Sequence, residues 1–202
     1  MHNDLDEEIN ALFEMPEPEP KFSYDAMLDW ELLANRTILL HGEITEDLCY
    51  GTARELIALS KRSKEPIYII LNSIGGSVMD GLLIVETIDD IVRQGIEVNI
   101  EVRGIALSMG LDILLSGSHR SAGQWSSFLL HEMSETFGDE KLSLAKDRMK
   151  HADKMDKMLA ERVANRTKME ISKVKYHMER KDFFFFADQA LELGFIDEIN
   201  GK

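Results

Sequence analysis

Short apolar runs alternate with amphipathic segments along most of the chain, beginning at Thr37. A short continuous apolar run is typical of a buried strand, whereas apolar residues repeated every three or four positions indicate one face of a helix. The first half of the chain predicts strands at 37–41, 67–72 and 98–102, and helices at 46–61 and 78–94. This βαβ order indicates an α/β fold built on a mostly parallel sheet with crossover helices.

The second half of the chain predicts more helix than strand. A further apolar helix opens near Ser108, and the segment from Lys141 to Arg166 predicts one long amphipathic helix, of the kind that often projects to meet partners. The remaining predicted elements are a strand at 128–130, a helix, the apolar run 183–186, a short helix closed by Gly194 and a final strand at 195–199.

The first twenty residues break this pattern. They contain seven carboxylates and no Lys or Arg, and they end in alternating Pro and Glu. Apolar residues between Leu5 and Phe13 have helical spacing, which leaves a short docking helix open, but the acidic charge favours a solvated tail. We therefore predict that residues 1–30 form an acidic, partly flexible extension and that residues 31–202 form one domain.

Composition and charge narrow the function classes. The formal net charge of −14 disfavours a basic groove for nucleic acid or anionic lipid. No apolar run approaches the ~20 residues of a membrane helix, so we assign no transmembrane segment. The single cysteine, Cys49, excludes an intrachain disulfide and, with no signal-like N-terminus, favours a cytoplasmic protein. Cys49 itself is better explained as core filler on a helix than as a nucleophile.

The first candidate functional segment is Asn-Ser-Ile-Gly-Gly-Ser at 72–77, between a predicted strand and a predicted helix. Paired glycines let a substrate approach the backbone closely and let amide N–H groups point at a developing negative charge, as in an oxyanion hole. Taken alone, a glycine pair is better explained as a tight turn. A phosphate cradle is not supported, because neither a GxGxxG nor a GxxxxGK[ST] pattern follows.

The second candidate segment surrounds Ser108 with small residues where a predicted strand gives way to a helix. It resembles a nucleophile elbow, in which small neighbours permit a sharp bend that presents the serine Oγ at a helix N-terminus. Position 106 is Ala, so the G-x-S-x-G pattern of hydrolases is not met. Ser108 as a simple helix N-cap is an equally good explanation.

The third candidate feature is the pair His131 and Asp182, each of which lies beside an apolar run. Serine is a weak nucleophile that needs a nearby base, and the base in turn needs a third group to orient it. Spacing alone does not select this pair, because Asp182 could equally cap a turn. The histidines that compete for the role are His2, His41, His119, His151 and His177.

Taken together, these segments resemble the proteolytic subunit of the Clp protease. The matching segments are YIILNSIGGSVMDGLLIVETI, GIALSMGLDILLSG, FLLHEM and KDFFFFADQALELGFIDEI. They occur in the order and at roughly the spacing of the family's NSPGGS, AASMG and IHQP runs and of its late Asp before a Phe. The resemblance covers the chain from about Leu32 to its C-terminus, and four ordered motifs are far more specific than one.

The resemblance implies a serine endopeptidase with a ClpP/crotonase-type fold of stacked βαβ units. Ser108 matches the family's nucleophile, His131 its base and Asp182 the third member of the triad, while the amides of Gly76 and Met109 match its oxyanion donors. Such a subunit needs no metal or nucleotide cofactor.

The resemblance also implies an assembly. The long helix would form the protruding handle that interlocks two heptameric rings around a chamber, giving fourteen subunits. An ATP-driven unfoldase feeds unfolded polypeptides into such a chamber, so we expect a homo-oligomer with peptide substrates and no membrane or nucleic-acid partner.

Four positions depart from the family pattern. Ile74 and Met133 replace prolines in the loops that flank the site, which changes loop stiffness or the shape of the peptide groove but removes no catalytic group. Arg180 and Lys181 stand where the family usually has an acid and then an arginine that join the rings. Whether the protein forms one ring or two therefore stays open.

Four other functions stay open beside a housekeeping protease. A non-catalytic Clp-like subunit is disfavoured because all three triad residue types are present. A dedicated, virus-type processing peptidase would fit the unusual N-terminus. A crotonase-type acyl-CoA enzyme would share the fold without the triad, and a relative of signal-peptide peptidases would need a Ser-Lys pair, which is not evident.

Overall fold

The computed structural model describes residues 23–134, 141–179 and 182–201. The chain divides into two units, residues 1–31 and 32–202, and each is described by itself. The described part of the first unit contains the start of helix α2 (Tyr24–Ala34). The sequence pattern did not predict this helix. The predicted docking helix and the acidic tail up to residue 22 lie outside the described residues.

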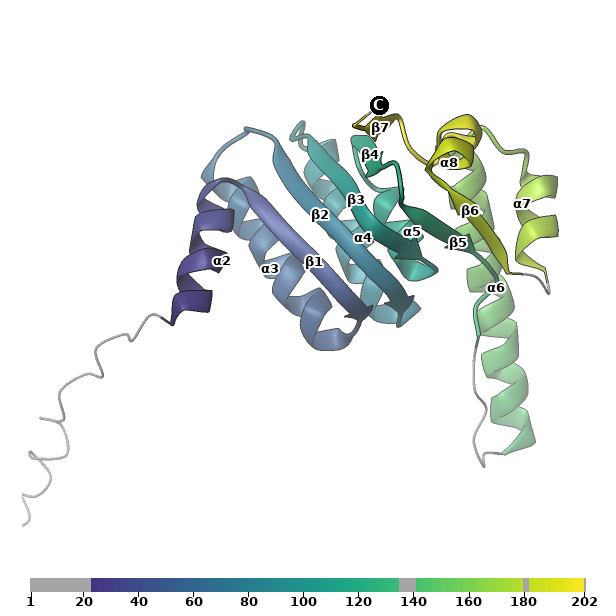
Figure 1. Ribbon diagram of the computed structural model, residues 1–202. Coiled ribbons are helices and arrows are strands. Elements are labelled where there is room, and N and C mark those ends of the chain that lie inside the picture. The colour runs from purple at the N-terminus through teal and green to yellow at the C-terminus, as the bar shows by residue number, and fades with distance from the viewer. Residues whose placement is uncertain (1–22, 135–140, 180–181, 202) are drawn as a thin grey trace, which may run out of the picture. The chain divides into compact units, whose positions relative to one another are not determined.

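The second unit is built on one sheet, which contains seven strands among the described residues (Figure 1). They are β1 (Thr37–Ile44), β2 (Ile67–Gly76), β3 (Val98–Leu107), β4 (His119–Gly123), β5 (Ser127–Leu130), β6 (Phe183–Phe186) and β7 (Glu198–Asn200). The main path runs β1-β2-β3-β4-β7, and all of its neighbours are parallel. Strand β3 forks, because its first half pairs with β4 and its second half with β5. Only β5 and β6 pair antiparallel in the described part of the sheet.

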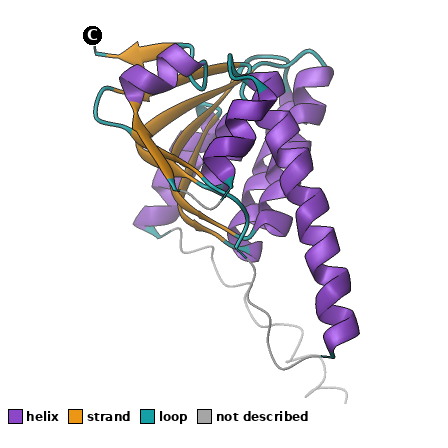
Figure 2. Cartoon of the chain, turned by 90° about the vertical axis from the view of Figure 1, so that its right-hand side faces the viewer, coloured by secondary structure: helices purple, strands orange, loops and turns teal. Residues whose placement is uncertain are grey.

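Three crossover helices cover one face of this sheet (Figures 1 and 2). They are α3 (Glu46–Arg62), α4 (Val78–Arg93) and α5 (Met109–Leu114). Helix α3 begins where the Thr45 hydroxyl accepts a hydrogen bond from the Leu48 amide, and its fully buried Leu56 contributes about 2 kcal/mol by leaving water. Cys49 lies in this core, as expected, and burial together with the nearby Asp80 charge raises the pKa of its thiol to about 11.

Three further helices follow along the chain: α6 (Leu142–Arg166), α7 (Ile171–Met178) and α8 (Ala187–Leu193). The buried residues of α6 all lie in its C-terminal part, and its N-terminal half projects past the other helices (Figure 2). Arg166 anchors the buried end by donating to the carbonyl oxygens of Leu115 (2.7 Å) and Gly117 (2.6 Å). The sequence prediction of one long projecting helix is therefore confirmed.

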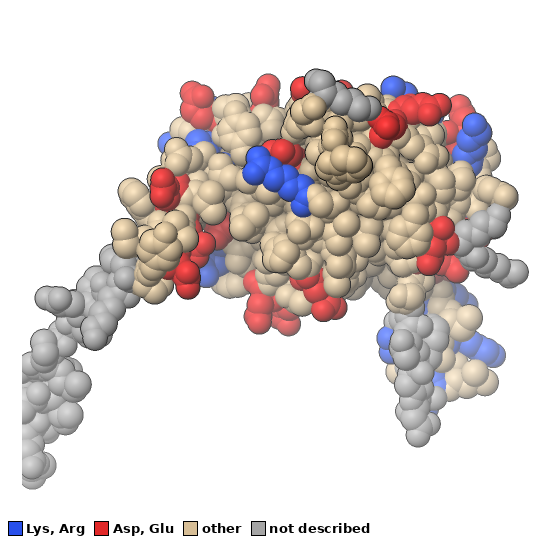
Figure 3. Space-filling view, in the orientation of Figure 1, with Lys and Arg blue, Asp and Glu red and all other residues tan. Residues whose placement is uncertain are grey.

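The opposite face of the sheet carries several exposed apolar side chains. Figure 3 shows this face with Lys and Arg at separate positions and with wide uncharged areas over the strands. Its strands expose the large apolar side chains Leu39, Tyr68, Phe184 and Phe186. Exposed apolar area of this extent is typical of surfaces that contact other proteins.

The α/β class and the parallel sheet agree with the sequence prediction, but several element boundaries were wrong and one strand was missed. Strands β1 and β3 continue beyond the predicted residues 41 and 102, to Ile44 and Leu107. Strand β2 does not end at residue 72, because it continues through Gly75 and Gly76, which pair with β1. Strand β4 was missed because its sequence, HRSAG, has no apolar run. The final strand starts three residues later than predicted, since Phe195 and Ile196 are buried in the turn that follows helix α8.

Candidate active site

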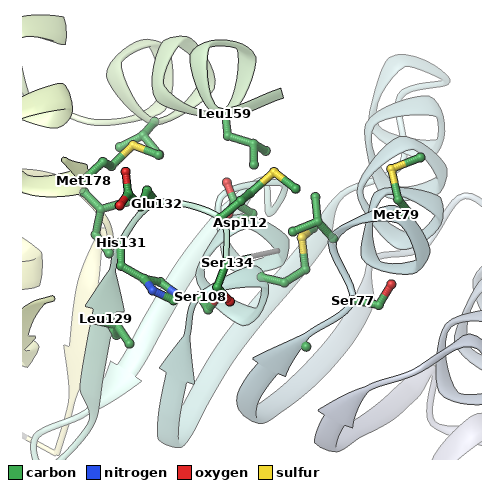
Figure 4. Close-up of a pocket in the computed structure, with 16 residues that line it drawn as sticks. Ser77, Met79, Ser108, Asp112, Leu129, His131, Glu132, Ser134, Leu159 and Met178 are labelled. Atoms are coloured by element: carbon green, nitrogen blue, oxygen red, sulfur yellow. The ribbon is translucent and has the colours of Figure 1, made fainter. Parts of the chain in front are cut away.

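An open pocket of about 280 Å³ lies where three parallel strands end (Figure 4). Gly76 ends β2, Ser108 follows β3 and His131 follows β5, and all three residues line the pocket. Ligands of open α/β sheets bind outside the carboxyl ends of the strands, because the turns there bring residues from separate segments together. The three segments that the sequence singled out therefore meet at one place.

Ser108 occupies a strained turn between β3 and α5. Its φ of 53° and ψ of −124° are unusual for a residue with a side chain, and such outliers concentrate at functional sites. Its amide donates to the Leu129 carbonyl oxygen at 3.0 Å, which ties the turn to β5. The Ser108 side chain makes no hydrogen bond to the first turn of α5, so the alternative that it caps this helix is wrong.

Strand β2 passes directly over this turn at Gly75. A Cβ atom at Gly75 would lie 2.6 Å from the Leu107 carbonyl oxygen and 2.7 Å from the Ser108 Cβ, and the φ of +87° also favours glycine. At Gly76 a Cβ atom would collide with the carbonyl oxygen of Ile44. Glycine at residue 75 is thus what allows the β2 backbone to lie against Ser108, whereas glycine at residue 76 allows β2 to lie against Ile44 of β1.

Irregular strand pairing accompanies the close approach of β2 to Ser108. The register of β1 with β2 shifts after Gly42, and the register of β2 with β3 shifts after Leu71. Between these shifts the buried Ser73 hydroxyl donates to the Gly42 carbonyl oxygen (2.7 Å) and accepts from the Gly75 amide (3.1 Å). Ser73 therefore holds the bulged strand end in place, a role that the sequence analysis missed.

The antiparallel register of β5 with β6 brings His131 and Asp182 together. The last pair in that register is Leu130 with Phe183, so the next residues along each strand, His131 and Asp182, come to lie opposite each other. The His131 Nδ1 and Asp182 Oδ1 atoms are 3.7 Å apart, slightly longer than a hydrogen bond. The His131 side chain is 25% exposed and the Asp182 side chain is 64% exposed.

None of the other histidines in the described residues lines this pocket. Their places are β1 for His41, β4 for His119, α6 for His151 and α7 for His177. His2 lies outside the described residues. Among the described histidines, only His131 therefore lines the pocket.

A side chain from helix α6 holds the backbone just after His131. The Asp156 carboxylate accepts a hydrogen bond from the Met133 amide at 2.9 Å. Partial burial raises the pKa of Asp156, although the Met133 hydrogen bond acts in the opposite direction. Sequence spacing gives no sign of this contact, because it joins positions on two separate elements.

A second acid that the sequence analysis passed over, Asp112, lines the pocket from helix α5. Its Oδ1 is fully buried and has no hydrogen-bond partner. Burial raises the pKa of Asp112 to about 7, although the charge of Arg162 acts against the shift. A lone acid in the apolar helix sequence MGLDIL, four residues after Ser108, is a signal that could have identified it.

The described residues contain no group of three or more His, Cys, Asp or Glu side chains placed to hold a metal ion. In the same part of the chain, no helix is long and apolar enough to span a bilayer. Arg180 and Lys181, which bear on ring pairing, lie outside the described residues.

The fold and the pocket define an α/β protein with its candidate site at the ends of parallel strands. The chain belongs to the Clp protease family, whose model matches residues 22–202, and the seven-stranded α/β structure of the described residues is consistent with the fold of that family. The expected ClpP/crotonase-type fold is therefore confirmed.

Individual relatives agree with this assignment. An ATP-dependent Clp protease proteolytic subunit 3 from Rhodococcus jostii is 30% identical over 183 residues, which cover 89% of this chain and 88% of the relative. An ATP-dependent Clp protease proteolytic subunit from Streptococcus mutans is 33% identical over 176 residues, which cover 83% of this chain and 86% of the relative. The recognition of the family from four short motifs is thus confirmed over most of the chain.

Proposed function

We propose that this protein is a serine endopeptidase of the Clp proteolytic-subunit type, with Ser108 as nucleophile, His131 as general base and Asp182 as the group that orients His131. The observation that carries the proposal is the strand register, which brings Ser108 and His131 to one pocket and sets Asp182 opposite His131. Family membership supports peptidase chemistry. Two observations support Ser108 as the nucleophile: its backbone is strained, and its side chain makes no capping hydrogen bond to α5.

In the proposed mechanism, His131 removes the Ser108 proton as Oγ attacks a peptide carbonyl carbon. The imidazolium that forms is stabilised by Asp182, and it then protonates the leaving amine before water hydrolyses the acyl-enzyme. The geometry of the resting protein supports the role of Asp182, because its 3.7 Å separation from His131 is only slightly longer than a hydrogen bond.

We assign the backbone amides of Gly76 and Met109 as the donors that bind the negative oxygen of the tetrahedral intermediate. Both residues line the pocket beside Ser108. Met109 is the first residue of α5, where an amide has no partner within the helix, and Gly76 has no side chain of its own. Donors fixed in this way stabilise charge without having to reorganise during the reaction.

The same proposal extends to assembly and partners. Membership of a family of Clp proteolytic subunits supports an oligomer that works with an ATPase, and the projecting α6 and the apolar open face of the sheet supply surfaces for subunit contact. We assign a homo-oligomeric ring, heptameric or paired into fourteen subunits, that cleaves unfolded polypeptides in the cytoplasm. Residues 31–202 would form the peptidase domain and residues 1–30 an acidic extension.

A non-catalytic Clp-like subunit is the second candidate, and one observation favours it. The His131–Asp182 contact is longer than a hydrogen bond and Asp182 is mostly exposed, so the pair is less constrained than the buried triads of serine peptidases. Active-site labelling separates the two candidates.

The test combines a fluorophosphonate probe, a fluorogenic peptide and native mass measurement on the wild-type protein, Ser108→Ala and Ser134→Ala. Ser134 is an exposed serine of the same pocket and serves as the matched control. We expect a ring that is labelled and active in the wild type and in Ser134→Ala, and a ring of the same mass that is neither labelled nor active in Ser108→Ala. An assembled wild-type ring without labelling or hydrolysis would contradict the proposal and favour the non-catalytic subunit.

A further inference from the structure

The pocket extends beyond the catalytic side chains to an apolar wall formed by helices α6 and α7. Leu159 and Val163 of α6 and Met178 of α7 line this part. A substrate side chain that projects from the residue acylated by Ser108 would enter here, since Ser108 lines the same pocket. Apolar walls suit an aliphatic chain, so the polar groups among them decide which side chains are accepted.

Asp112 lies in this part of the pocket, one helical turn from Ser108. The Asp112 amide lies 3.4 Å from the Ser108 carbonyl oxygen, so the two residues share a face of the helix start. Figure 4 shows Asp112 between Ser108 and Leu159. The residue keeps some exposed surface although its Oδ1 is fully buried, and its exposed part faces the pocket that it lines.

No cation among the described residues forms an ion pair with the Asp112 carboxyl group. The charge of Arg162 of α6 acts on Asp112, but the terminal nitrogens of Arg162 bind the Asp89 carboxylate (2.8 and 3.3 Å) and the Ser116 hydroxyl (2.6 Å), and its Nε is buried without a hydrogen-bond partner. None of the ion pairs of the described residues includes Asp112. A buried acid without an ion pair resists ionisation, in keeping with its raised pKa of about 7, and a bound cation would remove this penalty.

The other charged residues that line the pocket also favour a positively charged ligand. Among the described residues, the pocket is lined by the carboxylates of Asp112 and Glu132 and by His131, with no Lys or Arg. Glu132 is exposed, whereas the Asp112 Oδ1 is fully buried. An incoming basic side chain would therefore meet the exposed Glu132 carboxylate and the buried Asp112 carboxyl group, which ionises as the cation binds.

We propose that this pocket selects peptides with Lys or Arg immediately before the cleaved bond, with the Asp112 carboxylate as the counter-charge. This inference rests on the proposed function. The methylene groups of a Lys or Arg side chain would pack on Leu159 and Val163 while the charged end reaches Asp112. A purely apolar side chain would instead leave the carboxyl group buried and unpaired, which disfavours its binding.

The test compares two fluorogenic peptides that differ only in Lys or Leu before the cleaved bond. For the wild-type protein we expect kcat/KM to favour the Lys peptide by about tenfold or more, the size typical of a charge-assisted contact. Asp112→Asn keeps the shape and removes the charge, and we expect it to bring the Lys-to-Leu ratio to about 1. Glu132→Gln removes the other carboxylate, and we expect it to lower the ratio by no more than about twofold because that group is solvated.

Three results would overturn the inference. Two of them are a wild-type ratio at or below 1 and an Asp112→Asn ratio equal to that of the wild type. A loss of preference in Glu132→Gln as large as in Asp112→Asn would also overturn it, because general negative charge would then explain the effect. If Asp112→Asn does not fold, the wild-type ratio and the Glu132→Gln ratio still decide the sign of the preference.

Measurements of peptide binding distinguish a failure of this inference from a failure of the proposed function. Ser108→Ala cannot form an acyl-enzyme, so its affinity for fluorescent forms of the two peptides reports on the pocket alone. Tighter binding of the Lys peptide to Ser108→Ala than to the Ser108→Ala, Asp112→Asn double variant supports the pocket even if the wild type is inactive, in which case only the proposed function fails. Hydrolysis and labelling without any preference for Lys would leave the peptidase assignment intact and overturn the role of Asp112.

Discussion

The two sides of the candidate site are held in different ways. On the nucleophile side, β2 and β3 lie so close together that only glycine fits at residue 75, and a strained backbone presents Ser108. On the base side, His131 and Asp182 stand at the ends of two antiparallel strands, partly exposed and 3.7 Å apart. One side is fixed by backbone contacts, whereas the other depends on side-chain reach.

This difference teaches which part of the site tolerates change. Backbone contacts at van der Waals distance have no freedom to adjust, because neighbouring strands would have to move together. Side chains at a strand end can reach the required geometry by rotating about their own bonds. Substitutions on the nucleophile side should therefore cost more free energy than substitutions on the base side.

The largest effect is expected for Gly75→Ala. Its new Cβ atom would overlap the Leu107 carbonyl oxygen and Ser108, so we expect kcat/KM to fall by at least about 1,000-fold. Gly95→Ala is the matched control, because Gly95 has nearly the same φ (+82° against +87°) but nothing within 4 Å of its Cβ position. Circular dichroism and peptide hydrolysis measure folding and activity. If both variants were equally active, the tight crossing of β2 would be unnecessary.

The second effect concerns the stability of the nucleophile side against pH. Because burial raises the pKa of Asp112 to about 7, the folded state holds this proton more tightly than the unfolded state does, and stability decreases between about pH 4 and pH 7. We expect Asp112→Asn to raise the free energy of unfolding by about 4 kcal/mol at pH 8 and by little below pH 4. Urea unfolding at both pH values measures this gain, and Glu132→Gln should show none. A gain independent of pH would mean that Asp112 is not buried as an acid.

The third prediction addresses the base side. We expect Asp182→Asn to lower kcat/KM by about 100-fold, less than for a buried triad acid, because Asp182 is mostly exposed. Glu198→Gln is the matched control, since Glu198 lies 3.7 Å from His119 in a similar exposed pair away from the pocket. Equal activity of Asp182→Asn and Glu198→Gln would remove Asp182 from the mechanism.

The smallest effect is expected for Asp156→Ala, which removes the acceptor of the Met133 amide behind His131. We expect about a tenfold lower rate of fluorophosphonate labelling, the cost of one lost hydrogen bond. Asp153→Ala, on the same helix, removes only an exposed ion pair with Lys157 and should label at the wild-type rate. A fall of 1,000-fold or more would show instead that the base side is as rigid as the nucleophile side.

Much of the fold could be predicted from periodicity alone. Strands β1 and β3 and helices α3, α4 and α6 are long or strongly patterned, and the sequence placed each of them. Strand β4 could not be predicted, because its polar sequence is a strand only through its pairing with β3 and β7. The extension of β2 through two glycines likewise depends on its pairing with β1, since glycine weakens an isolated strand.

The candidate site divides in the same way. Motif resemblance suggested Ser108, His131 and Asp182 as candidates, while the contributions of Ser73, Asp156 and Asp112 come from contacts between elements. The sequence by itself determined the family, the βαβ order and the residue types available for catalysis, because these follow from local pattern and motif order. Only the tertiary structure decided which histidine lies in the pocket and which acid is buried there. Register, burial and distance arise when separate segments pack together, and no single segment carries them.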